Sequence, residues 1–378
     1  MHLSSLKLTQ FKNYERQSLR FSPRLNCFVG FNGAGKTNLL EAIYYLCMSK
    51  GYGSAVDQYN IRHGDRVARL EGLFDLDDGA QDKIVIKLRK RQRKIIERNG
   101  TPYERISEHI GRYPVVIVTP DDISLVLEGS ATRRRLLDNS LSQTDPQYLT
   151  QLITYNKLLE NRNAQLKELD GREDTTGLLD VYNAQMAEPA NYIFEKRRDF
   201  VAPFTELLLE AYAAISGERE EVGLEYQSQL SAQGWEELLA ERSEKDRILQ
   251  RTTGGIHRDD LVFVQEGHPL KRVASQGQLK SFVLSLKLAQ YRLLERSTAR
   301  TPILLLDDIF DKLDHERVRQ LLELVMSSAF GQLFITDTDP ERVTSLIGDH
   351  PEMEWERFLV AEGVARNEAE WKQLLEEE

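Results

Sequence analysis

Two short segments of this 378-residue chain carry residue types that bind phosphate and a divalent cation. The first, GFNGAGKT at residues 30–37, has the Gly-x-x-x-x-Gly-Lys-Thr pattern of a phosphate-binding loop. Its glycines let backbone N–H groups face phosphate oxygens, Lys36 brings positive charge to the β- and γ-phosphates, and the Thr37 hydroxyl can bind Mg²⁺. The residues predicted to bind ATP are Gly30, Phe31, Asn32, Gly33, Ala34, Gly35, Lys36, Thr37 and Asn38.

The second segment, ILLLDD at residues 303–308, places two carboxylates after an apolar run. Four consecutive apolar residues are typical of a buried strand in a parallel sheet, and ligands bind at the carboxyl ends of such strands. Asp307 is therefore predicted to hold Mg²⁺ together with Thr37, and Asp308 to polarise an attacking water. Lys36 and Asp308 are thus the predicted catalytic residues. The alternative is an acidic cap on the next helix.

A third segment, SQGQ at residues 275–278, lies just before the acidic strand. On the residues alone, Ser275 could simply be the N-cap of a helix. A long insertion between the phosphate loop and the acidic strand, with such a segment upstream of the strand, is nevertheless typical of ABC-type ATPases. In those proteins the serine and its helix N-terminus bind the γ-phosphate held by a partner subunit. Ser275, Gly277 and Gln278 are therefore predicted to contact ATP across an ATP-dependent homodimer.

The composition fits a soluble globular protein, with 40% apolar residues, 29% charged residues and a net charge of -10. This charge argues weakly against a general nucleic-acid coat, but local basic patches matter more than the total. Cys27 and Cys47 lie in apolar segments and are expected to be reduced core residues, as in a cytoplasmic protein. No window approaches the ~18 apolar residues of a membrane span, so no membrane partner is expected.

The periodicity of apolar residues predicts an α/β fold. With the resemblance of the motif spacing to ABC-type ATPases, it implies an ABC-type P-loop ATPase head interrupted by an inserted helical arm, called lobe II. We predict a head formed by residues 1–140 and 236–378 and an arm over residues 141–235, in which two long helices are separated by a break at 171–177. Further expected elements are strands within 3–29, 67–105, 114–119, 303–307 and 332–336, helices over 38–50, 275–296 and 314–328, and a return of strand and helix near Val222 and Trp235.

A cluster of basic residues lies near the tip of a predicted hairpin. Such side chains can follow the phosphates of DNA without reading its sequence. A solvated hairpin is the alternative. For the basic run at 133–135, a structural or interlobe role is at least as well supported as DNA contact, and the run at 196–198 is better explained as a solvated helix face. The residues proposed to contact DNA are Lys87, Arg89, Lys90, Arg91, Arg93 and Lys94.

Together these segments resemble the RecF family of bacterial recombination mediators, which belongs with the SMC-type DNA-repair ATPases. The similarity covers nearly the whole chain. It is carried by FKNY (11–14), GFNGAGKTN (30–38), PDDISLVLEGSATRRRLLD (120–138), TTGGIHRDDL (252–261), SQGQLK (275–280), LLLDDIFDKLD (304–314) and FITDTD (334–339). The resemblance implies a slow, DNA-stimulated ATPase that uses ATP and Mg²⁺. It also implies a cytoplasmic protein that dimerises on DNA gaps or junctions, maintains replication forks, and helps RecO and RecR load the strand-exchange recombinase.

Two departures from the family pattern concern the nucleotide. Asp337 stands where a small polar residue is usual and where ABC transporters place a switch histidine, and Ile256 follows Gly255 where proline is expected. Sensing of the γ-phosphate by Thr336 or Thr338 therefore stays open, and no Q-loop glutamine is assigned. The alternatives are a transporter subunit, which needs a membrane partner, a fragment of a long coiled-coil ATPase, and a DNA clamp that hydrolyses ATP slowly.

Overall fold

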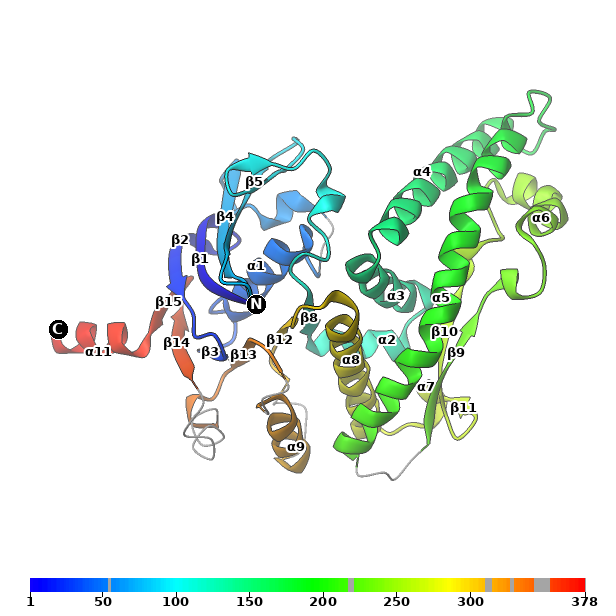
Figure 1. The fold of residues 1–378 in the computed structure, drawn as a ribbon. Helices are drawn as coiled ribbons and strands as arrows, with labels where there is room; N and C mark the ends of the chain where they lie inside the picture. Colours follow the sequence, from blue (N-terminus) through cyan, green and yellow to red (C-terminus); the bar gives the residue numbers. More distant parts are fainter. Residues whose placement is uncertain (54–55, 217–220, 310–314, 327–329, 343–353, 378) are drawn as a thin grey trace. The chain divides into compact units, whose positions relative to one another are not determined.

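The computed structural model describes residues 1–53, 56–216, 221–309, 315–326, 330–342 and 354–377. The chain forms two compact units (Figure 1). The first unit comprises Met1–Asp122, Ala214–Ser216 and Lys280–Glu378, and the second comprises Ile123–Ala213 and Gly217–Leu279. The first unit is therefore built from both ends of the chain, as expected for the head.

A six-stranded sheet, in the order β15-β14-β3-β13-β12-β8, carries the motif segments of the first unit. Its strands run parallel except β15, which is antiparallel to β14. Four of them are buried along their whole length, which explains their nearly continuous apolar sequences. The strands are β3 (Leu25–Val29), β8 (Val115–Val118), β12 (Ile303–Leu306), β13 (Leu333–Asp337), β14 (Trp355–Ala361) and β15 (Val364–Asn367).

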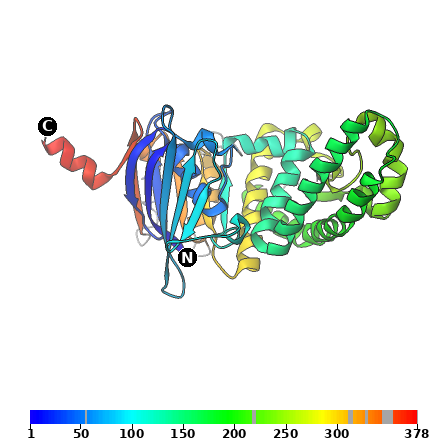
Figure 2. The ribbon, with the colours of Figure 1, turned by 90° about the horizontal axis from the view of Figure 1, so that it is seen from above.

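A second sheet, antiparallel and in the order β2-β1-β4-β5-β6-β7, forms the other layer of this unit, and Figure 2 shows its strands side by side. Buried and more exposed residues alternate along β4, as in a sheet with one face on a core. Asn99 and Gly100 both have positive φ in the turn from β6 to β7, which is what the Asn-Gly pair predicts. The strands are β1 (His2–Phe11), β2 (Tyr14–Arg20), β4 (Val67–Asp75), β5 (Gln81–Arg89), β6 (Ile95–Arg98) and β7 (Thr101–Pro102).

Helix α1 (Lys36–Met48) contacts strands of both sheets and is buried on almost every side. Four phenylalanines, Phe21, Phe28, Phe334 and Phe358, pack with ring centroids 4.9–6.1 Å apart in the core beneath it. The remaining helices of this unit are most of α8 (Gln276–Thr298), α9 (His315–Met326) and α11 (Glu368–Glu377).

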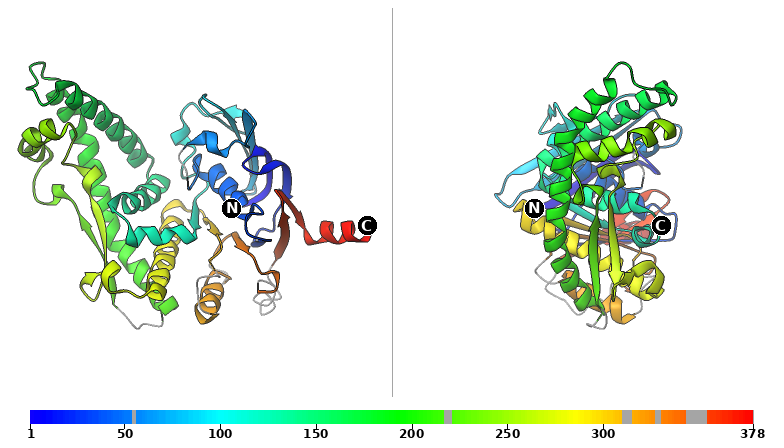
Figure 3. Two further views of the ribbon diagram at one scale, coloured as in Figure 1. Left: turned by 180° about the vertical axis from the view of Figure 1, so that it is seen from behind. Right: turned by 90° about the vertical axis from the view of Figure 1, so that its right-hand side faces the viewer.

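The second unit is mainly helical and carries a three-stranded sheet in the order β11-β10-β9. Its two longest helices, α4 and α5, lie side by side, separated by the predicted break (Figure 3). The elements are α2 (Ser124–Leu127), α3 (Ser130–Thr144), α4 (Pro146–Leu169), α5 (Leu178–Ser216), β9 (Val222–Gln227), α6 (Trp235–Leu249), β10 (Asp260–Gln265), β11 (His268–Pro269) and α7 (Leu270–Val273).

This unit extends beyond the arm expected over residues 141–235 at both ends. The reason is that α3 packs on both α4 and β10, so segments on either side of the expected arm join one core. Ion pairs connect segments of that core: Arg133 forms two bonds to Asp260, and Arg197 pairs with both Asp138 and Asp259 at 2.8 Å. Arg133 therefore has a structural partner. Arg197 is buried between Asp138 and Asp259, so the expectation of a solvated helix face is wrong at this position.

Candidate nucleotide site

The phosphate-binding loop connects β3 to α1, so the N-terminus of a helix opens directly onto it. Gly33 and Gly35 have φ values of 81° and 119°, a region that glycine adopts without strain. A β-carbon at Gly35 would also lie 2.4 Å from the Asn13 amide nitrogen and 2.9 Å from the Tyr14 hydroxyl. This close packing is the physical reason for glycine before the lysine.

Asn13 and Tyr14, from the FKNY segment, support the loop. The Asn13 side chain donates a hydrogen bond of 3.1 Å to the Ala34 carbonyl, and the Tyr14 hydroxyl donates one of 3.0 Å to the Gly35 carbonyl. Asn38 in turn donates to Asn13 at 2.8 Å. These bonds hold the backbone of the loop in place, together with the Ala34 N–H, which donates to the Phe31 carbonyl at 3.2 Å. Sequence reasoning recorded FKNY only as a family feature and gave it no role at the site.

The Lys36 side chain lies across the loop. Its ammonium group donates to the carbonyls of Gly30, at 2.7 Å, and Phe31, at 3.1 Å. The side chain is almost fully buried, and the charge is held beside the loop amides that would face a phosphate. An anion placed there would meet both the helix N-terminus and this charge.

Strand β13 lies between β3 and β12, and it completes a cluster of oxygen atoms at the carboxyl ends of these strands. Thr37 Oγ1 donates to Asp307 Oδ1 at 3.0 Å, and Thr336 Oγ1 donates to the same oxygen at 2.8 Å. The backbone N–H of Asp308 donates to Thr336 Oγ1 at 2.8 Å. The fold thus brings Thr37, Asp307 and Asp308 together as predicted from the sequence.

The electrostatics of Asp307 fit a cation site. Burial raises the pKa of Asp307, and the neighbouring charge of Asp308 adds to the rise, whereas the hydrogen bonds from Thr336 and Thr37 and the charge of Lys36 oppose it. A nearby divalent cation would favour the ionised carboxylate. The adjacent hydroxyl and carboxylate oxygens are ligands that Mg²⁺ prefers.

Thr336 also holds the backbone of Asp308 in place. Asp308 has a φ of 47°, a left-handed conformation that is uncommon for residues other than glycine and is enriched at functional sites. Asp337 differs from Thr336: it is buried, and its carboxylate accepts from the Asp339 N–H at 2.9 Å. Side chains alternate between the two faces of the sheet along residues 334–337, and this alternation could have identified Thr336 as the residue that faces Asp307. That inference requires knowing that β13 lies beside β12.

Ser275 lies exposed at the start of α8 and forms a reciprocal capping box with Gln278. The Gln278 N–H donates to Ser275 Oγ at 3.3 Å, and the Ser275 N–H donates to Gln278 Oε1 at 2.6 Å. The serine is therefore an N-cap. Its Oγ accepts in this box, so the hydroxyl hydrogen can still be donated to an anion. Gly277 lies in the first turn of the same helix.

The basic cluster divides into two groups. Four of its residues are exposed: Arg89 at the end of β5, and Lys90, Arg91 and Arg93 in the loop from β5 to β6. Lys94 is different: only 14% of its side chain is exposed, and its ammonium group contacts Asp57 at 3.0 Å and the Ser49 carbonyl at 2.5 Å. The structure therefore corrects the inclusion of Lys94 among DNA contacts, because its charge is neutralised inside the unit at the carboxyl end of α1. Lys87 is half-buried and paired with Glu97.

Sequence comparison decides the family. Residues 2–346 match the RecF/RecN/SMC N-terminal domain family. The DNA replication and repair protein RecF of Flavobacterium johnsoniae is 44% identical over 349 residues, which cover 92% of this chain and 97% of that protein. The RecF of Bacteroides fragilis is 40% identical over 376 residues, covering 99% and 100%. This chain belongs to the RecF family. The resemblance noted from the motifs is thereby confirmed for RecF.

Solved structures agree with this assignment. The recombination mediator RecF of the RecFOR pathway, in forms named RecF-ATP and RecF-ATPrS, superposes with TM-scores of 0.87 and 0.86 at 27% and 26% identity, over 97% of this chain. The Smc head domain of Pyrococcus furiosus shares the fold alone, with a TM-score of 0.56 at 16% identity. The predicted fold class, an α/β ABC-type ATPase head with a helical insertion, is confirmed. Within the described ranges, no helix has the length and apolar character needed to cross a membrane.

Proposed function

We propose that this protein binds ATP and Mg²⁺ at the described site, hydrolyses ATP slowly, and uses the ATP-bound form to hold DNA as a homodimer. One observation carries the proposal. The segment after β3 carries Lys36 and Thr37, and the segment after β12 carries Asp307 and Asp308; strand β13 lies between β3 and β12. Hydrogen bonds from Thr37 and Thr336 to Asp307, and from the Asp308 N–H to Thr336, connect the two segments. Such a group of a cation, a hydroxyl and two carboxylates at a helix N-terminus supports phosphoryl transfer.

Each residue has a distinct role in this proposal. Lys36 and the loop amides bind the triphosphate, while Thr37 and Asp307 hold Mg²⁺, which would neutralise phosphate charge when bound. Asp308 orients or deprotonates the attacking water. An open pocket of 890 Å³ next to the loop, lined by Asn38 and Tyr59 among others, offers room for the nucleoside.

The proposed dimer places the α8 N-terminus of one subunit on the γ-phosphate held by the other. Ser275→Arg should raise the dissociation constant of the ATP-bound dimer at least about tenfold, equivalent to ~1.4 kcal/mol. The affinity of the monomer for ATP should stay within about twofold, because a monomer binds ATP through its own phosphate loop and not through Ser275. Multi-angle light scattering across a concentration series with ATP measures the first quantity, and nucleotide titration of dilute protein measures the second.

Asn367→Arg provides a matched control for Ser275→Arg. Asn367 caps α11 through the same kind of reciprocal box, with Glu370, at 2.8 and 3.2 Å. Both substitutions remove a cap, at a cost of ~1 kcal/mol, but only the first faces the proposed partner. A Ser275→Arg dimer as tight as the Asn367→Arg dimer would show that Ser275 has no role across subunits.

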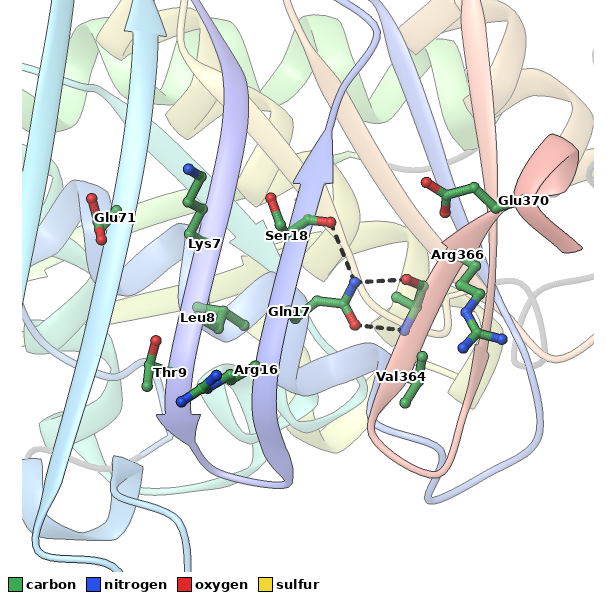
Figure 4. A pocket seen from close by; sticks show the side chains of 11 residues that line it. Lys7, Leu8, Thr9, Arg16, Gln17, Ser18, Glu71, Val364, Arg366 and Glu370 are labelled. Carbon is green, nitrogen blue, oxygen red and sulfur yellow. Dashed lines mark hydrogen bonds between the residues drawn. The ribbon is translucent and has the colours of Figure 1, made fainter.

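DNA is proposed to lie against the exposed loop from β5 to β6 and the adjoining outer face of the antiparallel sheet. A pocket of 590 Å³ is lined by Lys7 and Arg16, from β1 and β2, and by Arg366, from β15 of the other sheet. Figure 4 shows these side chains. The same lining holds two acidic residues: Glu71 is paired with Arg69 and Lys83, at 2.7 and 3.0 Å, and Glu370 accepts a hydrogen bond from the Asn367 N–H at 3.2 Å. The positive charges suit a phosphate backbone rather than base recognition.

Reversal of Arg89, Arg91 and Arg93 to glutamate should weaken duplex binding and lower its salt dependence, because each lost phosphate contact reduces the slope of log affinity against log salt by about 0.9. Fluorescence anisotropy at several salt concentrations, with ATP present, measures both. The control reverses Lys157, Lys245 and Arg251, which are exposed on the second unit and give the same change in net charge. If the two variants show the same slope of log affinity against log salt, the loop from β5 to β6 does not contact DNA.

The biological role proposed from the relatives is recombinational repair and maintenance of replication forks. The protein would recognise gaps or junctions between single-stranded and duplex DNA and act with RecO- and RecR-type mediators to load the recombinase. Hydrolysis stimulated by DNA would then release the dimer. Family membership and the RecFOR pathway named for the matched structures support this role.

A further inference from the structure

The second unit contains a cavity whose lining includes none of the residues proposed to bind ATP, Mg²⁺ or DNA. Its volume is 290 Å³, and helices α2, α3 and α7 and strands β9, β10 and β11 contribute to its lining. All of these elements belong to the second unit. A cavity of this volume is near the lower end of the range for small-ligand sites, so it has room for a few side chains of a peptide.

Arg133 forms a fixed basic wall of this cavity. Its guanidinium group donates to both carboxylate oxygens of Asp260, at 2.7 and 2.9 Å, and to the carbonyls of Leu125 and Glu128, at 3.1 and 2.8 Å. It also lies 5.9 Å from the centre of the Phe263 ring. These four bonds leave one N–H of the guanidinium group, on Nη2, without an acceptor among the described residues. The wall is therefore held in one geometry and still has a donor for a ligand.

Two further cations, Lys271 and Arg272 on α7, line the same cavity. Both are exposed, and neither forms an ion pair within the part of the chain that the structure describes. The lining holds one carboxylate, Asp260, which is paired with Arg133, so two positive charges remain. This excess is local, because the whole chain has a net charge of -10. A positive potential inside a concave site attracts an anionic ligand.

Most of the remaining lining is apolar. Val126 comes from α2, Val262 and Phe263 come from β10, and Pro269 comes from β11. Val262 and Pro269 are only partly buried, so some of their apolar surface is in contact with water. An apolar group that covered this surface would remove it from water, which favours binding.

We propose that this cavity binds an acidic segment of a partner protein. In the bound segment, one or two carboxylates contact Lys271 and Arg272, and a neighbouring apolar side chain covers Val262 and Pro269. Charge complementarity, the partly exposed apolar wall and the small volume together select this ligand. The inference depends neither on the proposed ATP-dependent dimer nor on the proposed DNA surface.

A peptide fits this lining better than a nucleic acid does. Phosphates would pair with the two cations, but a sugar–phosphate backbone offers little apolar surface for Val262 and Pro269. In addition, Glu225 on β9 is exposed and lies directly opposite Val262 in the sheet. A chain of phosphates that continued along β9 would therefore meet a like charge, which is unfavourable.

Selection of a random library of short peptides, displayed on phage, against the full-length protein tests the proposal. We expect the enriched peptides to combine Asp or Glu with a neighbouring apolar or aromatic residue. Their affinities are then measured by fluorescence anisotropy with labelled synthetic copies. The double variant Lys271→Glu/Arg272→Glu should weaken binding about tenfold or more, because it replaces attraction by repulsion at the contact.

Two matched controls separate the cavity from general effects. Lys157→Glu/Lys245→Glu makes the same change in net charge at exposed positions outside the lining, and it should change peptide affinity by less than about twofold because solvent screens distant charges. Val262→Thr should weaken binding about threefold, since a hydroxyl replaces one methyl group of the apolar wall. Val264→Thr, on the same face of β10 but outside the lining, is its control.

Several outcomes would contradict the proposal. It is wrong if the selection enriches no acidic peptides, or if both charge reversals weaken peptide binding equally. Equal effects of the two valine substitutions would show that no apolar side chain of the ligand covers Val262. If reversal of Lys271 and Arg272 weakens the binding of duplex DNA and leaves peptide affinity unchanged, the cavity serves nucleic acid instead.

Discussion

Asp308→Asn should retain ATP and stop its hydrolysis, slowing the single-turnover rate by about a hundredfold or more, which is the usual contribution of a general base. The amide cannot accept a proton from water, but it keeps the shape of the side chain. The bond from the residue 308 N–H to Thr336 uses only backbone, so the left-handed turn at this position should survive. Binding of ATP is proposed to depend on Lys36 and Asp307, so the ATP affinity of this variant should change little.

The same variant should stay on DNA. Because hydrolysis is proposed to release the dimer, dissociation from a gapped duplex after ATP loading should slow in proportion to hydrolysis. Stopped-flow release of labelled DNA and quenched-flow hydrolysis are measured on the same sample. Asp339→Asn is the control, since this nearby carboxylate accepts from the Glu341 N–H and asparagine caps equally well. Hydrolysis by Asp308→Asn at the Asp339→Asn rate would show that another group activates the water.

The parts of the site that sequence could predict are those whose chemistry is local. The phosphate loop needs its glycines, lysine and threonine within eight consecutive positions, and Asp307 is recognised from the apolar strand before it. Both were found where the structure has them. The role of Thr336 was missed because it depends on strand order: only the placement of β13 between β3 and β12 brings its hydroxyl to Asp307.

Charge was the least predictable property, because sequence gives no information on distant partners. Lys94 follows a run of exposed basic residues and looks equivalent to them, yet Asp57 and the end of α1 enclose it. Arg197 belongs to a polar, charged helix, yet it is buried between two aspartates. The bounds of the second unit could not be predicted from composition for a similar reason. Helix α3 has the polarity of a surface helix, but it packs on β10, which lies near the other end of this unit's sequence.

Lys36→Met should weaken ATP binding by about ten- to a hundredfold, because hydrogen bonds from a charged donor to a charged acceptor contribute ~1.5–3 kcal/mol. Methionine keeps much of the aliphatic stem that is buried in the loop, so the change removes mainly the charge and its donors. ATP-dependent dimerisation and DNA binding should be lost at nucleotide concentrations that saturate the unmodified protein. Isothermal titration with a slowly hydrolysed ATP analogue measures the affinity.

The structure also shows why stability must be checked in this experiment. The Lys36 ammonium group bonds to the carbonyls of Gly30 and Phe31, so its loss also removes contacts that hold the loop. Thermal unfolding without nucleotide isolates that effect. Adding ATP raises Tm by an amount that grows with the ratio of ligand concentration to dissociation constant. This shift therefore reports the affinity for ATP separately from the stability of the loop. Lys7→Met, on the outer face of the sheet, is the control for loss of one charge. A Lys36→Met protein with the same ATP-induced shift as Lys7→Met would mean that loop amides and the helix N-terminus bind the triphosphate without the lysine.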